Sequence, residues 1–165
     1  MVKPIFISLL LILAGAFVLL LILGRKSVRT EIDIEAPPSL VWQVLTNTSE
    51  AKSWNAVLIP VKGELVEGGR LIYSFRQEEG GETVQMDASV KSMRKNELIN
   101  QTGGLPLVLS FNHSFVLKEI PQGTKVIIHE KYRGIMVPFW NPAPVEKAYA
   151  RLLNSLKHRV LELNE

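Results

Sequence analysis

His113 and Glu130 are the two residues of this chain whose types and spacing could do chemistry together. Each lies in a run of alternating apolar and polar residues, and residues 120–123 (IPQG) join the two runs. If the runs form an antiparallel hairpin in which Glu119 pairs with Thr124, His113 lies directly opposite Glu130. Opposed side chains lie about 5 Å apart at Cβ. The pattern therefore predicts an imidazole beside a carboxylate on the apolar face of a sheet.

This pair has three alternative roles. It could be an acid–base couple that moves a proton, or it could orient the polar end of a bound ligand. It could also be a structural pair, because buried polar groups need partners in any case. A register slip of one residue would turn one of the two side chains to the other face. Catalysis by His113 and Glu130 is therefore one hypothesis among three, and a non-enzymatic role is favoured.

The predicted ligand cavity is formed by this pair and by the inward-facing aromatic and apolar residues around it. Inward aromatic residues are more often core than binding site, so packing is the alternative role for each of them. The predicted cavity residues are Trp54, Tyr73, Phe75, Met86, Phe111, His113, Glu130 and Tyr132.

Several other classes of site lack support in the sequence. The chain has no cysteine, which excludes disulfides, thiolate nucleophiles and Cys-ligated zinc. His129 and His158 fall on predicted solvated faces, so His113 lacks the further nitrogen ligands of a metal site. No serine has G-x-S-x-G context, and no Gly pair opens a helix after a buried parallel strand. We predict no metal and no cofactor.

Charge argues against a nucleic-acid partner. The formal net charge is +3, and of the 19 Lys and Arg residues only Lys3 precedes residue 25, which leaves 18 against 16 Asp and Glu. No Lys/Arg-rich run is interleaved with aromatic residues. We predict that the chain binds no nucleic acid.

The elements that must position the pair can be read from periodicity. Strands are predicted at 29–36 and 57–66, and further strands at 70–76, 83–93, 98–102, 108–118 and 124–133, with two short helices at 39–46 and 50–54. Gly103, Gly104 and Pro106 are expected to end the strand at 98–102. Residues 141–163 form a long amphipathic helix. Its apolar stripe is Val145, Ala148, Tyr149, Leu152, Leu153, Leu156, Val160 and Leu163.

Residues 134–140 (GIMVPFW) are expected to lead into the last helix and could cover the cavity mouth. Contact with a bilayer is an alternative, and a packed connector is favoured over both. Together the elements predict an α+β fold in which a curved antiparallel sheet of about six or seven strands wraps around the long C-terminal helix.

The first part of the chain is predicted to anchor it in a membrane. Residues 4–23 contain no charge, and twenty helical residues span the ~30 Å hydrocarbon core of a bilayer. A cleaved secretory signal is the alternative, but the run is longer than a signal's apolar region and no small-x-small site follows it. We assign residues 1–28 to the anchor and its basic flank, and residues 29–165 to the domain.

The basic residues around the apolar run predict its orientation. Arg25, Lys26 and Arg29 follow the run, whereas only Lys3 and the terminal amine precede it. The positive-inside rule then places the domain on the cytoplasmic side, by a margin of one charge.

Several segments of the chain resemble the SRPBCC superfamily, the helix-grip fold of START lipid-transfer domains and birch-pollen allergens. They are IEAPPSLVWQVLT (34–46), SWN (53–55), GELVEGGRL (63–71), HSFVL (113–117) and GTKVIIHEKYRG (123–134). Within it the chain is most similar to the bacterial polyketide cyclase/dehydrase-like group, over roughly residues 30–163. The resemblance implies a domain that binds lipids or other hydrophobic small molecules. It does not demonstrate a reaction.

The sequence thus predicts a single-pass, membrane-anchored domain that binds a hydrophobic small molecule or lipid. A polyketide cyclase/dehydratase-like enzyme that uses His113 and Glu130 is the alternative. A second alternative is a non-catalytic interaction module whose cavity is filled by its own side chains.

Overall fold

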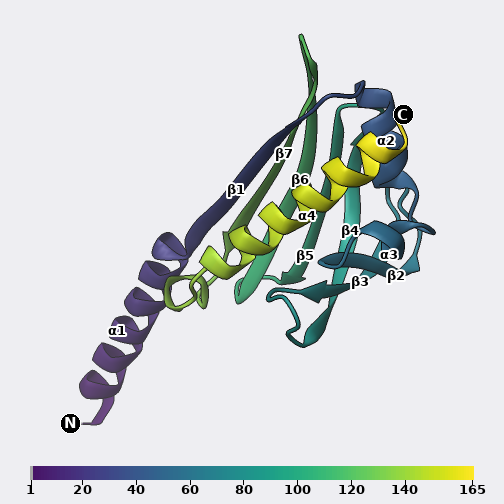
Figure 1. Cartoon of the computed structure of the whole chain (residues 1–165). Helices are drawn as coiled ribbons and strands as arrows, with labels where there is room; N and C mark the ends of the chain where they lie inside the picture. Colours follow the sequence, from purple (N-terminus) through teal and green to yellow (C-terminus); the bar gives the residue numbers. More distant parts are fainter. Residues whose placement is uncertain (1) are drawn as a thin grey trace.

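The computed structural model describes residues 2–165, as one sheet and its helices with an apolar helix projecting from one end (Figure 1). The helices are α1 (Val2–Leu23), α2 (Pro38–Thr46), α3 (Ala51–Trp54), the 3-10 turn η1 (Val137–Phe139) and α4 (Ala143–Glu162). The strands are β1 (Arg25–Ile34), β2 (Leu58–Gly63), β3 (Arg70–Arg76), β4 (Thr83–Arg94), β5 (Leu98–Leu105), β6 (Leu109–Ile120) and β7 (Gly123–Arg133).

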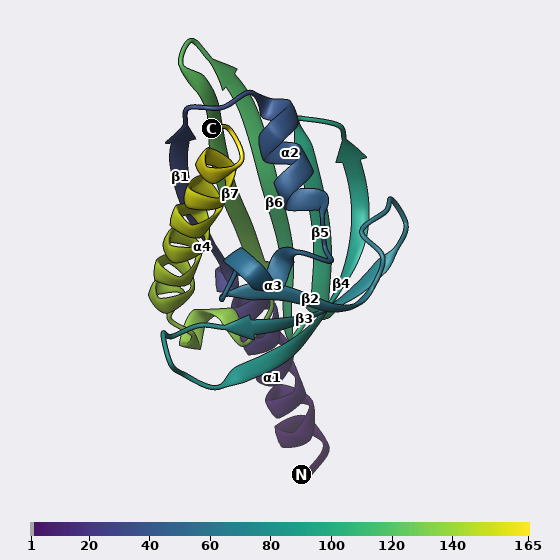
Figure 2. The ribbon, with the colours of Figure 1, turned by 45° about the vertical axis from the view of Figure 1, so that its right-hand side comes forward.

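The seven strands form one antiparallel sheet in the order β1-β7-β6-β5-β4-β3-β2. All neighbours except β1 and β7 are consecutive in the chain, which follows from short connections that return each strand beside the last. Register shifts interrupt the β2–β3 and β4–β5 pairs. Such bulges bend strands, and Figure 2 shows the sheet curving round α4 with β2 and β3 crossing one end. The predicted helix-grip architecture is confirmed.

The core lies between the concave face of the sheet and α4, whose apolar stripe faces the strands as far as Val160, whereas Leu163, predicted to belong to it, follows the helix and is exposed. Ala148, Leu152, Leu156 and Val160 of this stripe are fully buried. Helix α2 packs against both α4 and the sheet, which closes the far end of the core. An amphipathic helix is stable here because the sheet covers the apolar face that water would otherwise contact.

The prediction that Gly103 and Gly104 end their strand was wrong, because β5 continues to Leu105. A Cβ atom at Gly103 would lie 2.2 Å from the carbonyl oxygen of Asp87 and 2.4 Å from the ring of Phe111. Glycine is therefore required by close packing within the sheet. Gly104 has a φ of +85°, a conformation that glycine adopts without strain.

Helix α1 leads directly into the sheet, since only Gly24 separates it from β1. The strand begins at Arg25, four residues before the predicted start. Residues Phe6–Leu23 have a mean hydropathy of 3.1, and none of them is buried in the structure. By length and composition this helix could cross a membrane, although a signal sequence has the same properties.

Candidate functional site

The hairpin of β6 and β7 brings His113 and Glu130 together as predicted. Glu119 pairs with Thr124 and His113 pairs with Glu130 across the two strands. Both side chains point to the concave face, where His113 is 2% and Glu130 1% exposed. The alternation of the two strands and the length of their turn are sufficient to place the pair in the interior.

Two tyrosine hydroxyls hold the carboxylate of Glu130. The Tyr132 hydroxyl donates to Oε2 at 2.7 Å from the same face of β7. The Tyr149 hydroxyl, from the buried face of α4, donates a hydrogen bond to the same oxygen. The carboxylate is thus fixed from both layers of the fold, which orients it toward His113.

His113 is close to Glu130 but lacks a hydrogen bond to it. Its Nδ1 atom lies 3.7 Å from Oε2 of Glu130, which is too long for a good hydrogen bond. The rings of Phe115 and Tyr149 meet the imidazole edge-on, with centroids 4.9 and 5.2 Å away. Within residues 2–165, no group hydrogen bonds to either ring nitrogen, although both are buried. The imidazole is therefore positioned by packing and keeps its hydrogen-bonding capacity.

The surroundings of Glu130 also determine its protonation state. Burial alone would raise the pKa of Glu130, but the interaction with His113 and the hydroxyls of Tyr149 and Tyr132 outweigh it and lower that pKa below its ordinary value. Burial, together with the negative charge of Glu130, raises the pKa of Tyr149. At neutral pH the site therefore contains a carboxylate that accepts from two neutral hydroxyls.

Two small spaces lie near the pair, and only the first of them adjoins it. The first, of about 10 Å³, lies against His113, Glu130 and Tyr149. The second, of about 40 Å³, lies next to Trp54 and Phe115. Leu58, Tyr73 and Gln101 line both spaces, and the Gln101 amide donates to the Tyr73 hydroxyl at 2.6 Å.

The structure gathers most of the predicted cavity residues but not all. Trp54 borders only the second space, and Phe75 packs on the ring of Tyr149, 6.2 Å between centroids. Tyr132 binds Glu130 without lining either space. The predicted residues that line the first space are Tyr73, Met86, Phe111, His113 and Glu130.

Sequence reasoning missed Tyr149 and Gln101 as site residues. Tyr149 was predicted to be part of the apolar stripe of α4. Its hydroxyl was the available signal, since a buried tyrosine hydroxyl normally finds a partner. Gln101 lies two residues after Ile99 and therefore on the same dry face of its strand, so a buried amide could have been expected.

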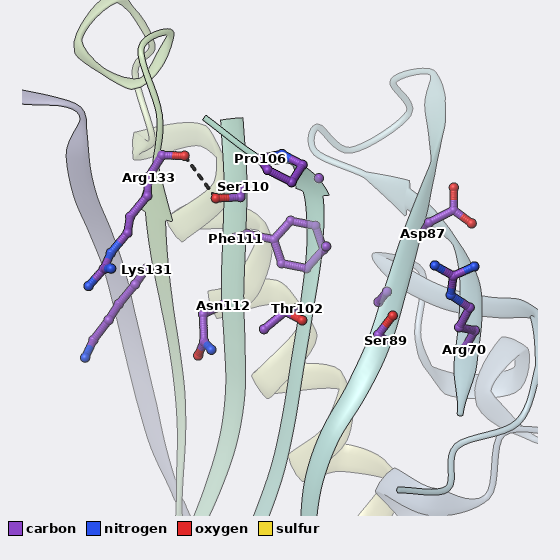
Figure 3. A pocket seen from close by; sticks show the side chains of 13 residues that line it. Arg70, Asp87, Ser89, Thr102, Pro106, Ser110, Phe111, Asn112, Lys131 and Arg133 are labelled. Atoms are coloured by element: carbon purple, nitrogen blue, oxygen red, sulfur yellow. Dashed lines mark hydrogen bonds between the residues drawn. The ribbon is translucent and has the colours of Figure 1, made fainter. Parts of the chain in front are cut away.

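A larger groove of about 600 Å³ lies on the outer face of the sheet (Figure 3). Pairing of β4 with β5 ends at Ala88 and Gly103, whereas β4 continues along β3, and β5 along β6. The two strands diverge there, and the ring of Phe111, on β6, lies against Gly103 of β5. Ala88 and Phe111 line both the groove and the inner space of 10 Å³, so they form part of the wall between them.

Comparison with known proteins agrees with this architecture. Residues 35–160 match the family described as "Activator of Hsp90 ATPase homolog 1-like protein". The chain belongs to this family. The AHSA1-like match, together with solved structures of the same fold, confirms the resemblance to SRPBCC domains. No curated protein matches the chain.

Solved structures share the AHSA1-like fold at low sequence identity. Protein MLL2253 from Mesorhizobium loti is 20% identical, with a TM-score of 0.64 over 85% of this chain and 99% of that one. TTHA0849 from Thermus thermophilus is 18% identical, with a TM-score of 0.66 over 85% and 100%. A norcoclaurine synthase point mutant from Thalictrum flavum, solved with a transition-state analogue, is 14% identical, with a TM-score of 0.61 over 86% and 97%. At these identities the likeness concerns the fold alone.

Proposed function

We propose that this AHSA1-like chain is a membrane-anchored domain that binds a hydrophobic small molecule or lipid, whose polar head meets His113. The observation that carries the proposal is a buried imidazole, beside a carboxylate, that has no hydrogen-bond partner among the residues described. A buried polar group left without a partner costs about 1–3 kcal/mol. A ligand hydroxyl or carbonyl that bonds to this ring would recover that free energy.

The surroundings of His113 suit an amphipathic ligand with a small head. The polar residues at the cavity wall are few, namely His113, Glu130, Tyr149 and the Gln101–Tyr73 pair. The remaining wall is apolar and aromatic. Binding sites for small molecules combine these two features, since apolar burial supplies affinity and a few polar groups fix orientation.

The size of the interior requires that side chains move when a ligand enters. The two small spaces measure about 10 and 40 Å³, whereas ligand pockets usually measure about 300–1,000 Å³. Trp54 and Met86 are half-buried at the edge of these spaces and are the side chains that we expect to be displaced. If they do not move, the domain is instead the filled interaction module.

The anchoring part of the proposal is supported by α1. This helix has 22 residues, which at about 1.5 Å each span a bilayer core. The side chains of Phe6–Leu23 lie outside the domain core, so they lack the protein contacts of a soluble core helix. We propose that it holds the domain at the cytoplasmic face, following the excess of basic residues after the helix.

The binding proposal is tested with residues 25–165, because no side chain of Phe6–Leu23 belongs to the core. The purified domain is extracted with organic solvent, and the extract is analysed by mass spectrometry. His113→Leu is the matched variant, since leucine fills most of the space of the imidazole but cannot form a hydrogen bond with the ligand head. A stoichiometric compound from the native domain, depleted in the variant, is the expected result. An empty extract and an unchanged melting temperature across a lipid panel would sink the binding proposal.

The proximity of His113 and Glu130 favours a second candidate, an acid–base enzyme. An imidazole that lies beside a carboxylate can move a proton to or from a bound ligand. His113→Gln and Glu130→Gln distinguish the candidates once a ligand is identified. Turnover that disappears while binding persists supports the enzyme, whereas binding without turnover in the native domain supports a carrier or sensor.

A further inference from the structure

One end of the domain exposes a cluster of large apolar side chains. Outside α1, nine such residues are exposed in the part of the chain that the structure describes. Four of them are scattered over β2, the loop after it, β4 and the chain end. The other five belong to the β5–β6 turn and to the η1 segment. These five, which we call the rim surface, are Leu105 (67% exposed), Leu107 (62%), Val108 (39%), Met136 (50%) and Phe139 (73%).

Backbone hydrogen bonds join the two halves of the rim surface. Ile135 N–H donates to the Leu107 carbonyl at 2.9 Å, and Met136 N–H donates to the Val108 carbonyl at 3.0 Å. Between the exposed residues, Val137 is fully buried and anchors η1 in the core. The η1 segment thus packs on the core with one side, as a connector, and exposes apolar side chains on its other side.

The rim surface lies where α1 leaves the domain. Gly134 N–H donates to the carbonyl of Gly24, the residue that follows α1, at 3.0 Å. The Lys26 ammonium donates to the carbonyls of Pro138 and Trp140 at 3.1 and 2.5 Å. Figure 1 shows the η1 segment beside the C-terminal end of α1. A bilayer that contained α1 would therefore meet the rim surface at its interface.

Leu107 is not explained by the needs of the fold. Its φ is +65°, in the left-handed region where glycine and asparagine are the ordinary residues. Its side chain is also largely exposed, so burial does not favour leucine at this position. An apolar residue that breaks the local rule of its turn, without gaining core contacts, indicates a role outside the fold.

Basic residues lie next to the rim surface. Arg25 pairs with Arg133 across β1 and β7, and Lys131 lies two residues before Arg133 on the same exposed face. Within residues 2–165, none of these three forms an ion pair. Figure 3 shows Lys131 and Arg133 together at one side of the outer groove. Exposed apolar side chains bordered by cations match the interface of an anionic membrane.

We propose that the rim surface docks into the bilayer that α1 crosses, with Leu107 and Phe139 inserted and Arg25, Lys131 and Arg133 on anionic headgroups. The inference rests on the anchoring part of the proposed function. Docking would hold the domain in one orientation on the membrane, rather than on a free tether.

The test uses the full chain in vesicles of phosphatidylcholine with and without phosphatidylglycerol. Because the chain has no cysteine, single cysteines at Leu13, Gln122 or Met136 can each carry one fluorophore. Lipids with a nitroxide near the headgroup end of the acyl chain then quench labels at the depth where interfacial groups insert, about 5–10 Å. Lipids with a nitroxide near the methyl end of the acyl chain quench a label in the middle of the bilayer, where a spanning α1 places Leu13. Leu13 reports on the anchor, Met136 on the rim surface, and Gln122 on the turn at the other end of β6.

A double variant distinguishes docking from mere proximity of the rim surface to the membrane. L107N/F139S removes two inserted side chains, and asparagine tolerates the φ of position 107. Val66→Ser is the matched control, since Val66 is also an exposed apolar residue (51%) but lies away from the rim surface. Circular dichroism and thermal unfolding establish that each variant keeps the native fold.

We expect the labels at Leu13 and Met136 to be quenched and the label at Gln122 not to be. Quenching at Met136 should be lost in L107N/F139S and retained in Val66→Ser. We also expect quenching at Met136 to increase with phosphatidylglycerol. Quenching at Leu13 alone would overturn docking and leave the anchor standing. Quenching at Met136 that survives the double substitution would also overturn the proposal. If neither label is quenched, docking fails together with the anchor.

Discussion

One carboxylate oxygen of Glu130 accepts hydrogen bonds from the hydroxyls of Tyr132 and Tyr149. The substitution Tyr149→Phe therefore tests how much these bonds stabilise the site. The substitution keeps the ring, which is 2% exposed, and removes only the hydroxyl that donates to Oε2. Hydrogen bonds to charged groups contribute about 1.5–3 kcal/mol. Because Tyr132 still donates to the same oxygen, we expect the variant to lose about 2 kcal/mol of unfolding free energy at neutral pH.

The loss should depend on pH, with a sign set by Glu130. The pKa of this carboxyl in the folded protein is lowered from 4.5, so its ionised form adds stability above about pH 4.5 that disappears as the pH falls through the folded value. Removing the Tyr149 hydroxyl raises the folded pKa and reduces this contribution. The stability difference between the native protein and the variant should therefore shrink below about pH 4.5.

Tyr73→Phe is the matched control. Tyr73 is also buried, at 8% exposure, but its hydroxyl accepts from the neutral amide of Gln101. We expect a loss of about 1 kcal/mol that does not change with pH between neutral and acid conditions. Urea unfolding of residues 25–165 at several pH values measures both variants. A Tyr149→Phe loss no larger than that of Tyr73→Phe, or one independent of pH, would refute an ionised Glu130 as the organising acceptor.

Three further substitutions test other parts of the fold by the same urea assay. Gly103→Ala should cost about 2–3 kcal/mol, because its Cβ would contact the Asp87 carbonyl and the Phe111 ring; a loss below about 1 kcal/mol would contradict this packing. Asn55→Ala should cost a similar amount, about 2–3 kcal/mol, since this buried amide makes three hydrogen bonds to the backbone before and within β2. Arg94→Ala removes an exposed ion pair and should change stability by less than about 0.5 kcal/mol; a larger change would indicate a role beyond the pair.

Local pattern was sufficient for much of the fold and for the central pair of the site. Alternation identified the dry face of each strand of the β6–β7 hairpin, and the short turn between them set the pairing of His113 with Glu130. The amphipathic stripe predicted both α4 and the need for a sheet beneath it. Glycine was less reliable, since Gly103 was read as a strand end where it is a close-packing position within β5.

The sequence by itself determined which side chains face inward, because side-chain direction follows from the period of each element. Only the tertiary structure decided which of them meet. Tyr149 reaches Glu130 because α4 crosses the sheet at one particular angle and position. The rim surface exists because Gly24, Lys26 and Gly134 hold the η1 segment beside the end of α1. Contacts between elements distant in the chain depend on the packing of the whole core, and no local periodicity encodes them.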